Sequence, residues 1–440
     1  MYTLKDIWKI SYPIIVGLIA QNVMLVIDTA FLGRVSEVTL GAAAIGGVFY
    51  LCMVMLATGF SIGAQIMIGR RNGEKNLPAI GKVFNHTQLF LILLAFFVWA
   101  LLTWAAPSFL EYFISSPAVL EESKVFIKYR KYGLLFGFIV LGFNALYVGS
   151  TRTMVLSLST FVMAFFNIIL DYVLIFGHYG FPEMGIAGAA IATNFAEFFT
   201  FVFYVVWTVK RRNHLTFGLF RFRKPDFTLL SALLKLAVPV MFQYFLSFAA
   251  WFVFFLIIEQ IGETELAASN ITRSIYMVLM IPVWGLSAAV NTLVSNTIGM
   301  GRPDMVVPLI KKILLLGLVI TLVVIQSIIF FPGYIAGLYT DNPALIETTL
   351  PLLRVVSIAL IAFGFGMILF NGLSGTGKTM LALKIEIASI LFYLLSTLFI
   401  ALYLKAPAHI VWMVEIVYFS AMGIFSLIAI KIGSWKKLAI

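Results

Sequence analysis

Long apolar runs separated by short polar segments set the pattern of this chain. A helix needs about 20 mostly apolar residues to cross the hydrocarbon core of a bilayer. Runs of this length predict twelve helices, near residues 7–32, 40–69, 82–106, 122–150, 154–177, 184–209, 228–258, 264–299, 308–331, 344–373, 380–404 and 408–431. The expected fold is therefore an all-α integral membrane protein with twelve transmembrane helices.

The two halves of the chain resemble one another at an offset of 226 residues, counted from 8 to 234. The segment "WKISYPI" at 8–14 corresponds to "LKLAVPV" at 234–240, which places Pro239 opposite Pro13. Each half holds six predicted helices, and because this number is even, both halves enter the membrane from the same side. The sequence therefore predicts two six-helix bundles related by a parallel repeat.

A basic connection in the middle of the chain separates the two halves. Its sequence, "KRRNHLTFGLFRFRKPD", contains no apolar run long enough to span a bilayer. We expect an N-terminal lobe at 1–209 with the first six helices, a linker at 210–227, and a C-terminal lobe at 228–440 with the last six.

The composition agrees with a membrane protein and predicts its orientation. Hydrophobic residues make up 62% of the chain and charged residues only 11%, whereas soluble domains carry about 25% charged residues. Cytoplasmic loops of membrane proteins hold an excess of Lys and Arg. Most of the 30 Lys and Arg residues fall in such loops if the N-terminus lies inside. We therefore expect a multi-pass monomer of the cell membrane (the inner membrane of a two-membrane cell), with both termini and the linker cytoplasmic, and no binding of nucleic acid.

One short segment matches a nucleotide-binding pattern. Gly372 to Thr379 reads G-x-x-x-x-G-K-T, the phosphate-binding loop that follows a strand in soluble α/β domains. Here apolar helices are predicted on both sides, and the repeat copy "FNALYVGSTRTM" at 143–154 does not match the pattern. Glycines also permit a tight turn between two helices. We therefore predict a turn at this position, no enzymatic activity and no cofactor.

Several motifs of the N-terminal half resemble those of the multidrug and toxic compound extrusion (MATE) transporters. They are "GLIAQNVMLVIDTAFLGR" at 17–34, "GRRNGEKN" at 69–76 and "NIILDYVLIFG" at 167–177. Polar residues inside apolar helices are costly, so they seldom recur at one spacing by chance. The resemblance covers essentially the whole chain. It implies a V-shaped antiporter of two bundles, which exports drugs or metabolites in exchange for H⁺ or Na⁺.

The C-terminal half departs from one branch of this family. Sodium-coupled members that resemble the NorM branch carry acids in the seventh and tenth helices, at positions that correspond here to Ser247 and Phe363. A cation site in the C-terminal half is therefore expected to be absent. The resemblance then points to the DinF-like type, in which the acids of the N-terminal half bind the coupling ion.

Five polar residues lie inside predicted helices of the N-terminal half. Asp28 is about four residues from the outer end of the first helix, and Gln21 lies two turns below it on the same face. Asn167 and Asp171 are one turn apart in the fifth helix, and Thr193 reaches their level from the sixth. An ionisable group inside a membrane segment is a functional candidate by default. We expect these residues to form the site for the coupling cation and the substrate, either as a proton site or as a Na⁺ site at Asp28 and Asp171.

Other polar residues in the apolar segments have two interpretations each. Asn144 belongs either to the cavity or to packing at the turn that follows it. Glu197 and Glu415 either line a cavity or bond neighbouring helices. Arg273 and Arg354 either attract an anionic substrate or extend outward to the membrane surface.

These observations predict a secondary antiporter that exports amphipathic, often cationic, organic compounds in exchange for H⁺, with Na⁺ as the alternative coupling ion. Proton binding at Asp28 would repack the first helix at Pro13 and release the substrate outward. The alternative is a flippase for lipids or lipid-linked oligosaccharides of the same superfamily. Such a flippase needs a cluster of Arg or Lys in its cavity, for which only Arg273 and Arg354 are candidates.

Overall fold

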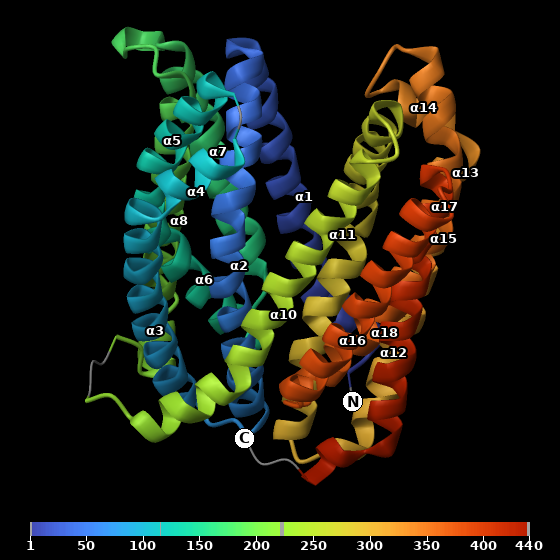
Figure 1. The fold of residues 1–440 in the computed structure, drawn as a ribbon. Coiled ribbons are helices and arrows are strands. Elements are labelled where there is room, and N and C mark those ends of the chain that lie inside the picture. The colour runs from blue at the N-terminus through green and yellow to red at the C-terminus, as the bar shows by residue number, and fades with distance from the viewer. Residues whose placement is uncertain (1, 115, 221–223, 438–440) are drawn as a thin grey trace. The chain divides into compact units, whose positions relative to one another are not determined.

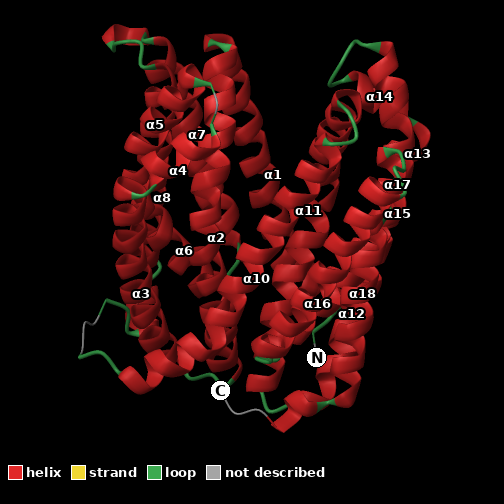
Figure 2. Cartoon of the chain, in the orientation of Figure 1, coloured by secondary structure: helices red, strands yellow, loops and turns green. Residues whose placement is uncertain are grey.

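The computed structural model describes residues 2–114, 116–220 and 224–437. Within these ranges the chain is helical, and only turns and short loops connect the helices (Figure 2). Arg221 and Arg223, two basic residues of the predicted linker, lie outside the described residues.

Six spans come from the first half of the chain (Figure 1). They are α1 (Leu4–Val35), α2 (Glu37–Gly73), α3 (Leu77–Trp104), the pair α5 (Pro117–Arg130) and α6 (Leu134–Gly149) joined by the 3₁₀ turn η1 (Lys131–Gly133), α7 (Met154–Phe176) and α8 (Gly185–Lys210). Shorter helices are α4 (Ala106–Phe113) and, in the predicted linker, α9 (Asn213–Phe217).

The second half supplies six more spans. They are α10 (Phe227–Glu259), α11 (Glu263–Gly299), α12 (Val306–Val324) with α13 (Gln326–Phe330), α15 (Pro343–Gly375), α16 (Thr379–Leu398) with the π-helical turn η4 (Phe399–Tyr403), and α18 (Val414–Ile432) after the short α17 (Ala408–Val411). The short α14 (Pro332–Gly337) precedes α15. In the described part of the chain, twelve helices are long and apolar enough to cross a membrane. This confirms the predicted fold class.

Polar caps set the ends of several of these helices. The side chains of Ser36, Asn76 and Asn342 accept hydrogen bonds from the first free backbone N–H groups of α2, α3 and α15. Such caps satisfy donors that have no partner within the helix. At the other end of α7, Gly177 adopts the left-handed conformation with φ 72°, which glycine reaches without strain. These caps and the glycine end one helix and begin the next, and so separate the spans of an apolar chain.

The helices form two compact units. We call residues 16–241 the N-unit, and residues 1–15 together with 242–440 the C-unit. The chain passes between the units inside two continuous helices, two residues after Pro13 in α1 and two residues after Pro239 in α10.

This division differs from the predicted lobes at two places. The first segment of α1 belongs to the C-unit, and the first segment of α10 belongs to the N-unit. Ile7 and Ile10 of α1 are buried in the hydrophobic core of the C-unit. In the N-unit, a Cβ on Gly63 of α2 would lie 2.4 Å from the Cα of Ala237, so the first part of α10 packs closely on α2. The linker therefore separates the two repeats in the sequence. The boundaries between the two packed units lie instead inside α1 and α10.

Aromatic residues fill the centres of both units. In the C-unit, Trp412 is fully buried and its indole N–H donates a 3.0 Å hydrogen bond to the Ser269 hydroxyl. In the N-unit, the rings of Phe143 and Tyr204 stack with centroids 5.2 Å apart. Buried Trp and Tyr side chains need a partner for their polar ends, and such polar ends organise the interior of each unit.

Candidate functional site

Asp28 of α1 and Asp171 of α7 meet inside the N-unit. The two helices approach closely at Gly17, where a Cβ would lie 3.3 Å from the Thr160 hydroxyl. Asp171 is fully buried, Asp28 is half-buried, and the two carboxyl groups are close enough to interact directly. The structure therefore brings together the two acids that the sequence predicted for the site.

Three of the four carboxyl oxygens of this pair receive no hydrogen bond from the described residues. Oδ1 of Asp28 and both carboxyl oxygens of Asp171 are buried, and no group in the described residues donates to them. Ionised carboxylates are acceptors only, so two of them cannot bond one another. A proton on one carboxyl would supply the missing donor and remove the repulsion between two like charges. This pair is therefore chemically suited to bind a proton or another cation.

Asn167 and Thr193 extend this acidic pair toward α8. Asn167 is fully buried one turn before Asp171, and its Nδ2 donates a 3.4 Å hydrogen bond to the Thr193 hydroxyl. That hydroxyl donates to the Ala189 carbonyl at 2.9 Å. The Asn167 Oδ1 is buried without a donor among the described residues. The cluster therefore has more acceptors than donors, as a cation-binding site requires.

A buried ion pair lies beside the acids. Arg130, at the end of α5, bonds Glu197 of α8 through both nitrogens, at 2.5 Å and 3.0 Å. Each of the two residues is only 8% exposed. Nη1 of Arg130 also donates to the Asn194 Oδ1 at 2.8 Å, and the guanidinium lies 4.3 Å from the Tyr50 ring centroid. Such a two-pronged, hydrogen-bonded pair is the geometry that best offsets the cost of burying charge.

A glycine of the 3₁₀ turn makes room for this pair. A Cβ on Gly133 would lie 2.2 Å from Nη1 of Arg130 and 2.5 Å from Oε2 of Glu197. The Arg130 charge is also close enough to act on Asp28. Arg130 therefore links the ion pair to the acidic pair.

The other predicted site residues lie elsewhere. Gln21 is exposed, and no described residue bonds its side chain to the acidic pair. Asn144 accepts a 2.5 Å hydrogen bond from the Tyr204 hydroxyl, which also accepts from Ser159 at 2.8 Å. Pro13 lies inside α1 in the C-unit segment of that helix. The structure thus groups four of the predicted residues, Asp28, Asp171, Asn167 and Thr193, and places Asn144 in a separate network.

Sequence reasoning missed Arg130. It lies eight residues inside the helix predicted at 122–150. Eight residues correspond to about 12 Å along a helix, a depth at which a charged residue needs a partner. Glu197, weighed only as a cavity or packing residue, is that partner.

The two arginines considered for an anionic substrate have different surroundings. Arg273 lies 4.9 Å from the Phe255 ring centroid, and Arg354 is exposed. In the C-unit, the hydroxyl of Ser247 reaches a buried acid that the sequence reasoning did not weigh, Glu386 of α16. Phe363 packs against Phe419 with ring centroids 4.8 Å apart.

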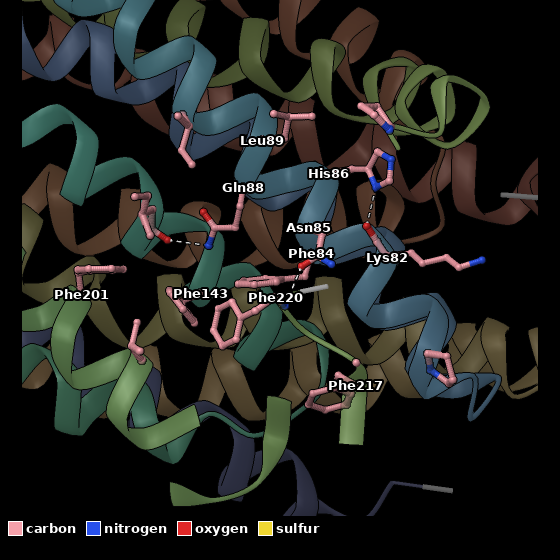
Figure 3. A pocket seen from close by; sticks show the side chains of 16 residues that line it. Lys82, Phe84, Asn85, His86, Gln88, Leu89, Phe143, Phe201, Phe217 and Phe220 are labelled. Carbon is pink, nitrogen blue, oxygen red and sulfur yellow. Dashed lines mark hydrogen bonds between the residues drawn. The ribbon is translucent and has the colours of Figure 1, made fainter. Parts of the chain in front are cut away.

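A separate cavity of about 510 Å³ lies in the N-unit between α3, α6, α8 and the segment after α8 (Figure 3). Phenylalanines dominate its lining, together with Lys82, His86 and Gln88. Nε2 of His86 accepts a 2.8 Å hydrogen bond from the Asp226 N–H, just before α10. The residues of the acidic cluster are not part of this lining.

The segment that matched a phosphate-binding loop is a turn between two long helices. Gly372–Gly375 end α15, and Thr379 begins α16, so a helix precedes the motif where a strand would be required. A Cβ on Gly375 would lie 2.4 Å from the Asn291 carbonyl oxygen, and Gly377 has φ 92°. Close helix packing and a tight turn account for these two glycines.

A family model described as MatE matches the chain twice, at residues 13–173 and 239–399. The chain belongs to the MATE family. The two matches begin 226 residues apart, at 13 and 239, which is the offset between the segments 8–14 and 234–240. This confirms the predicted repeat.

Relatives of this MATE protein match over most of its length. A probable multidrug resistance protein NorM of Thermotoga maritima is 26% identical, over 99% of this chain and 94% of its own. Multidrug resistance protein PmpM of Pseudomonas aeruginosa is 27% identical over 68% of this chain and 63% of its own.

Solved structures share the fold. An outward-facing multidrug resistance MATE transporter matches with a TM-score of 0.91 and 19% identity, over 99% of this chain and 97% of that one. A transporter of the same superfamily from Pyrococcus furiosus, described as having a binding pocket of reversed polarity, matches with a TM-score of 0.90 and 19% identity, over the same shares of the two chains. The protein is thus a multi-pass membrane transporter and not an enzyme, and MATE transporters need no cofactor.

Proposed function

We propose that this MATE protein is an antiporter that exports amphipathic, often cationic, organic compounds in exchange for protons. The observation that supports the exchange is the pair Asp28 and Asp171, of which three buried oxygens receive no hydrogen bond from the part of the chain that the structure describes. A buried carboxylate without a partner is costly, so the pair favours either a proton or a cationic ligand. Binding of one then disfavours the other, which is the thermodynamic requirement of exchange.

Arg130 tunes this competition. Its permanent positive charge lies near Asp28, and two carboxylates in contact repel one another when both are ionised. The acidic pair can therefore gain or lose a proton while the side chains around it stay in place. Because Asp28 lies on the same helix as Pro13, we infer that proton binding is transmitted along α1 and alters its packing near that proline.

The substrate class rests on the relatives. The proteins of Thermotoga maritima and Pseudomonas aeruginosa are named for multidrug resistance. An acidic site with a half-buried carboxylate at Asp28 suits organic cations better than anions. The flippase alternative lacks a specific observation in its favour, since Arg273 packs over Phe255 and Arg354 is exposed.

The proposed orientation places both termini in the cytoplasm of the cell that carries the protein. The supporting observations are the basic loops on that side and the even number of spans. Within the C-unit, the start of α1 and the end of α18 also lie at the same end (Figure 1). We propose that the protein works there as a monomer.

Purified protein in liposomes tests this function. A fluorescent organic cation is loaded, and either a pH gradient without Na⁺ or a Na⁺ gradient without a pH difference is imposed. We expect the pH gradient alone to drive transport. Strict dependence on Na⁺ would make Na⁺ the coupling ion, and transfer of a labelled lipid with no cation transport would favour the flippase.

A further inference from the structure

Glu386 is a buried acid of the C-unit that receives bonds from two other helices. It is 1% exposed and lies on α16, seven residues after the helix begins. Its Oε1 accepts a 2.7 Å hydrogen bond from the Tyr418 hydroxyl of α18 and also contacts the hydroxyl of Ser247 on α10. Its Oε2 is buried, and no described residue donates to it.

Glu415 completes a reciprocal arrangement between α16 and α18. Its Oε1 accepts a 2.8 Å hydrogen bond from the Tyr393 hydroxyl of α16. Each of the two helices thus contributes one acid and one tyrosine, and each acid is bonded by the tyrosine of the other helix. The ring centroids of Tyr393 and Tyr418 lie 5.1 Å apart.

Among the described residues, no positively charged side chain acts on Glu386 or Glu415. Neither glutamate belongs to an ion pair in the described part of the chain. The titratable groups that face the acids from the surrounding helices are tyrosines: Tyr244 of α10, Tyr276 of α11, Tyr393 of α16 and Tyr418 of α18. From α15 the neighbour of Tyr276 is the apolar ring of Phe363. Two ionised glutamates would therefore be buried without a counter-charge, which is far more costly than burying two neutral acids.

The hydroxyl protons around Glu386 indicate the same state. The Ser247 hydroxyl also lies 2.8 Å from the Gln243 carbonyl, and a serine has only one proton to donate. An ionised Glu386 would compete with the Gln243 carbonyl for that one proton, whereas a neutral Glu386 donates its own proton to Ser247, so that both contacts are hydrogen bonds. The neutral acid then makes both bonds, and its unpaired Oε2 is a carbonyl oxygen instead of an isolated carboxylate oxygen.

We propose that Glu386 and Glu415 form a second proton-binding site in the C-unit, and that the proton on Glu386 ties α10 to α16 through Ser247. Neither Glu386 nor Glu415 stands at one of the family's acid positions, which correspond here to Ser247 and Phe363. The presence of the proton is inferred from the local geometry alone. Its part in transport rests on the proposed function.

The position of Ser247 gives this proton a mechanical consequence. The chain enters the C-unit within α10 at residue 242, and Ser247 lies about one and a half turns further on. Gln243, next to the crossing, is held by a 3.0 Å hydrogen bond to the Thr379 carbonyl at the start of α16. Release of the Glu386 proton leaves a single Ser247 proton for two acceptors, the Gln243 carbonyl and the Glu386 carboxylate, so the contacts that hold this part of α10 to α16 must change.

Infrared difference spectroscopy tests the proton without any transport assay. The carboxylic acid C=O band of purified wild-type protein at neutral pH is compared with that of Glu386→Gln and Glu415→Gln, with Glu347→Gln at an exposed position as the matched control. We expect each of the two buried variants to lose a band that the control retains. Ser247→Ala should keep the Glu386 band but shift it to higher frequency, because the acid loses its acceptor. Absence of both bands in the wild type would overturn the proposal, as would their displacement by Na⁺ at constant pH.

The transport role is tested by the proton count. Wild type, Glu386→Gln and Glu347→Gln are compared in liposomes for protons exchanged per organic cation. We expect Glu386→Gln to exchange one proton fewer and to lose part of its pH dependence, while the control is unchanged. An unchanged proton count would reduce Glu386 to a structural acid and overturn its role in transport. The proposed function is tested separately, by the loss of proton-driven transport in Asp28→Asn. An unchanged proton count in Glu386→Gln would therefore contradict the second site without contradicting the proposed function.

Discussion

In the N-unit the guanidinium of Arg130 bonds the buried Glu197 and lies near the half-buried Asp28, which contacts Asp171. In the C-unit the side-chain partners of Glu386 and Glu415 among the described residues are hydroxyl groups. Both units derive from one repeated sequence pattern. The difference shows that a shared helical frame permits two ways of burying an acid. One offsets the charge with a fixed cation, and the other removes the charge by a proton.

The two arrangements have different consequences for function. A site that contains a permanent positive charge can hold an ionised acid, so a proton can leave and a cationic ligand can replace it. A site with hydroxyl donors alone strongly favours the neutral acid. The N-unit is therefore suited to exchange with a substrate, and the C-unit to a proton whose presence changes contacts between helices.

The largest expected effect is on transport by Asp28→Asn. Asn imitates the protonated acid permanently, so the exchange of a proton for a substrate stops while the fold is kept. We expect proton-driven efflux of a fluorescent cation to fall to the background of empty liposomes, with protein amounts matched. Asp171→Asn should weaken efflux less completely, because Asn167 and Thr193 keep part of the network.

Efflux at the wild-type rate by Asp28→Asn would show that the acidic pair is not the coupling site. The comparison between the units would then favour Glu386 and Glu415 as the acids that couple transport to the proton gradient.

The next largest effect is on stability, in Arg130→Ala. Removing one partner of a buried ion pair leaves the other charge uncompensated and typically costs about 3–5 kcal/mol. We expect a large loss of thermal stability in detergent. The double variant Arg130→Ala with Glu197→Ala should recover part of it, since no buried charge remains. A double variant less stable than the single one would contradict a predominantly electrostatic role.

A smaller effect is expected from Tyr418→Phe in the C-unit. This change removes one hydroxyl donor to a neutral acid and leaves the ring packing intact. The loss of a hydrogen bond of this kind costs about 0.5–1.5 kcal/mol. Thermal unfolding of Tyr418→Phe and Arg130→Ala side by side measures the contrast between the units directly. Equal losses of stability in the two variants would contradict the contrast between a buried charged pair and a buried neutral acid.

The smallest effect is expected at Lys378, outside both acid clusters. Its backbone N–H bonds the Thr376 hydroxyl, and the side chain makes no ion pair with a described residue. Lys378→Ala should change stability by less than about 0.5 kcal/mol, as is usual for such a site, and leave transport unchanged. Purified protein should show no ATP hydrolysis above background. An ATP-dependent transport signal that disappears in this variant would restore the phosphate-loop interpretation.

The sequence by itself determined the twelve spans, the repeat and the family. Hydropathy over 20 residues is a local property, and membrane-spanning segments must satisfy it wherever they lie. Polar residues such as Asp28 and Asp171 were visible for the same reason, because each interrupts an apolar segment. Helix length and depth then placed Asn167 and Thr193 near them, and the structure brings the four together.

Only the tertiary structure decided which polar groups face one another. The pairing of Arg130 with Glu197, and of Ser247 with Glu386, depends on the rotation of each helix about its axis. A helix that is apolar on nearly all sides carries little periodic signal for that rotation. The crossings of α1 and α10 between the units were hidden as well, because a helix that continues past Pro13 or Pro239 looks like one span in the sequence. Side-chain packing across helices, which links residues far apart in the chain, fixed these features.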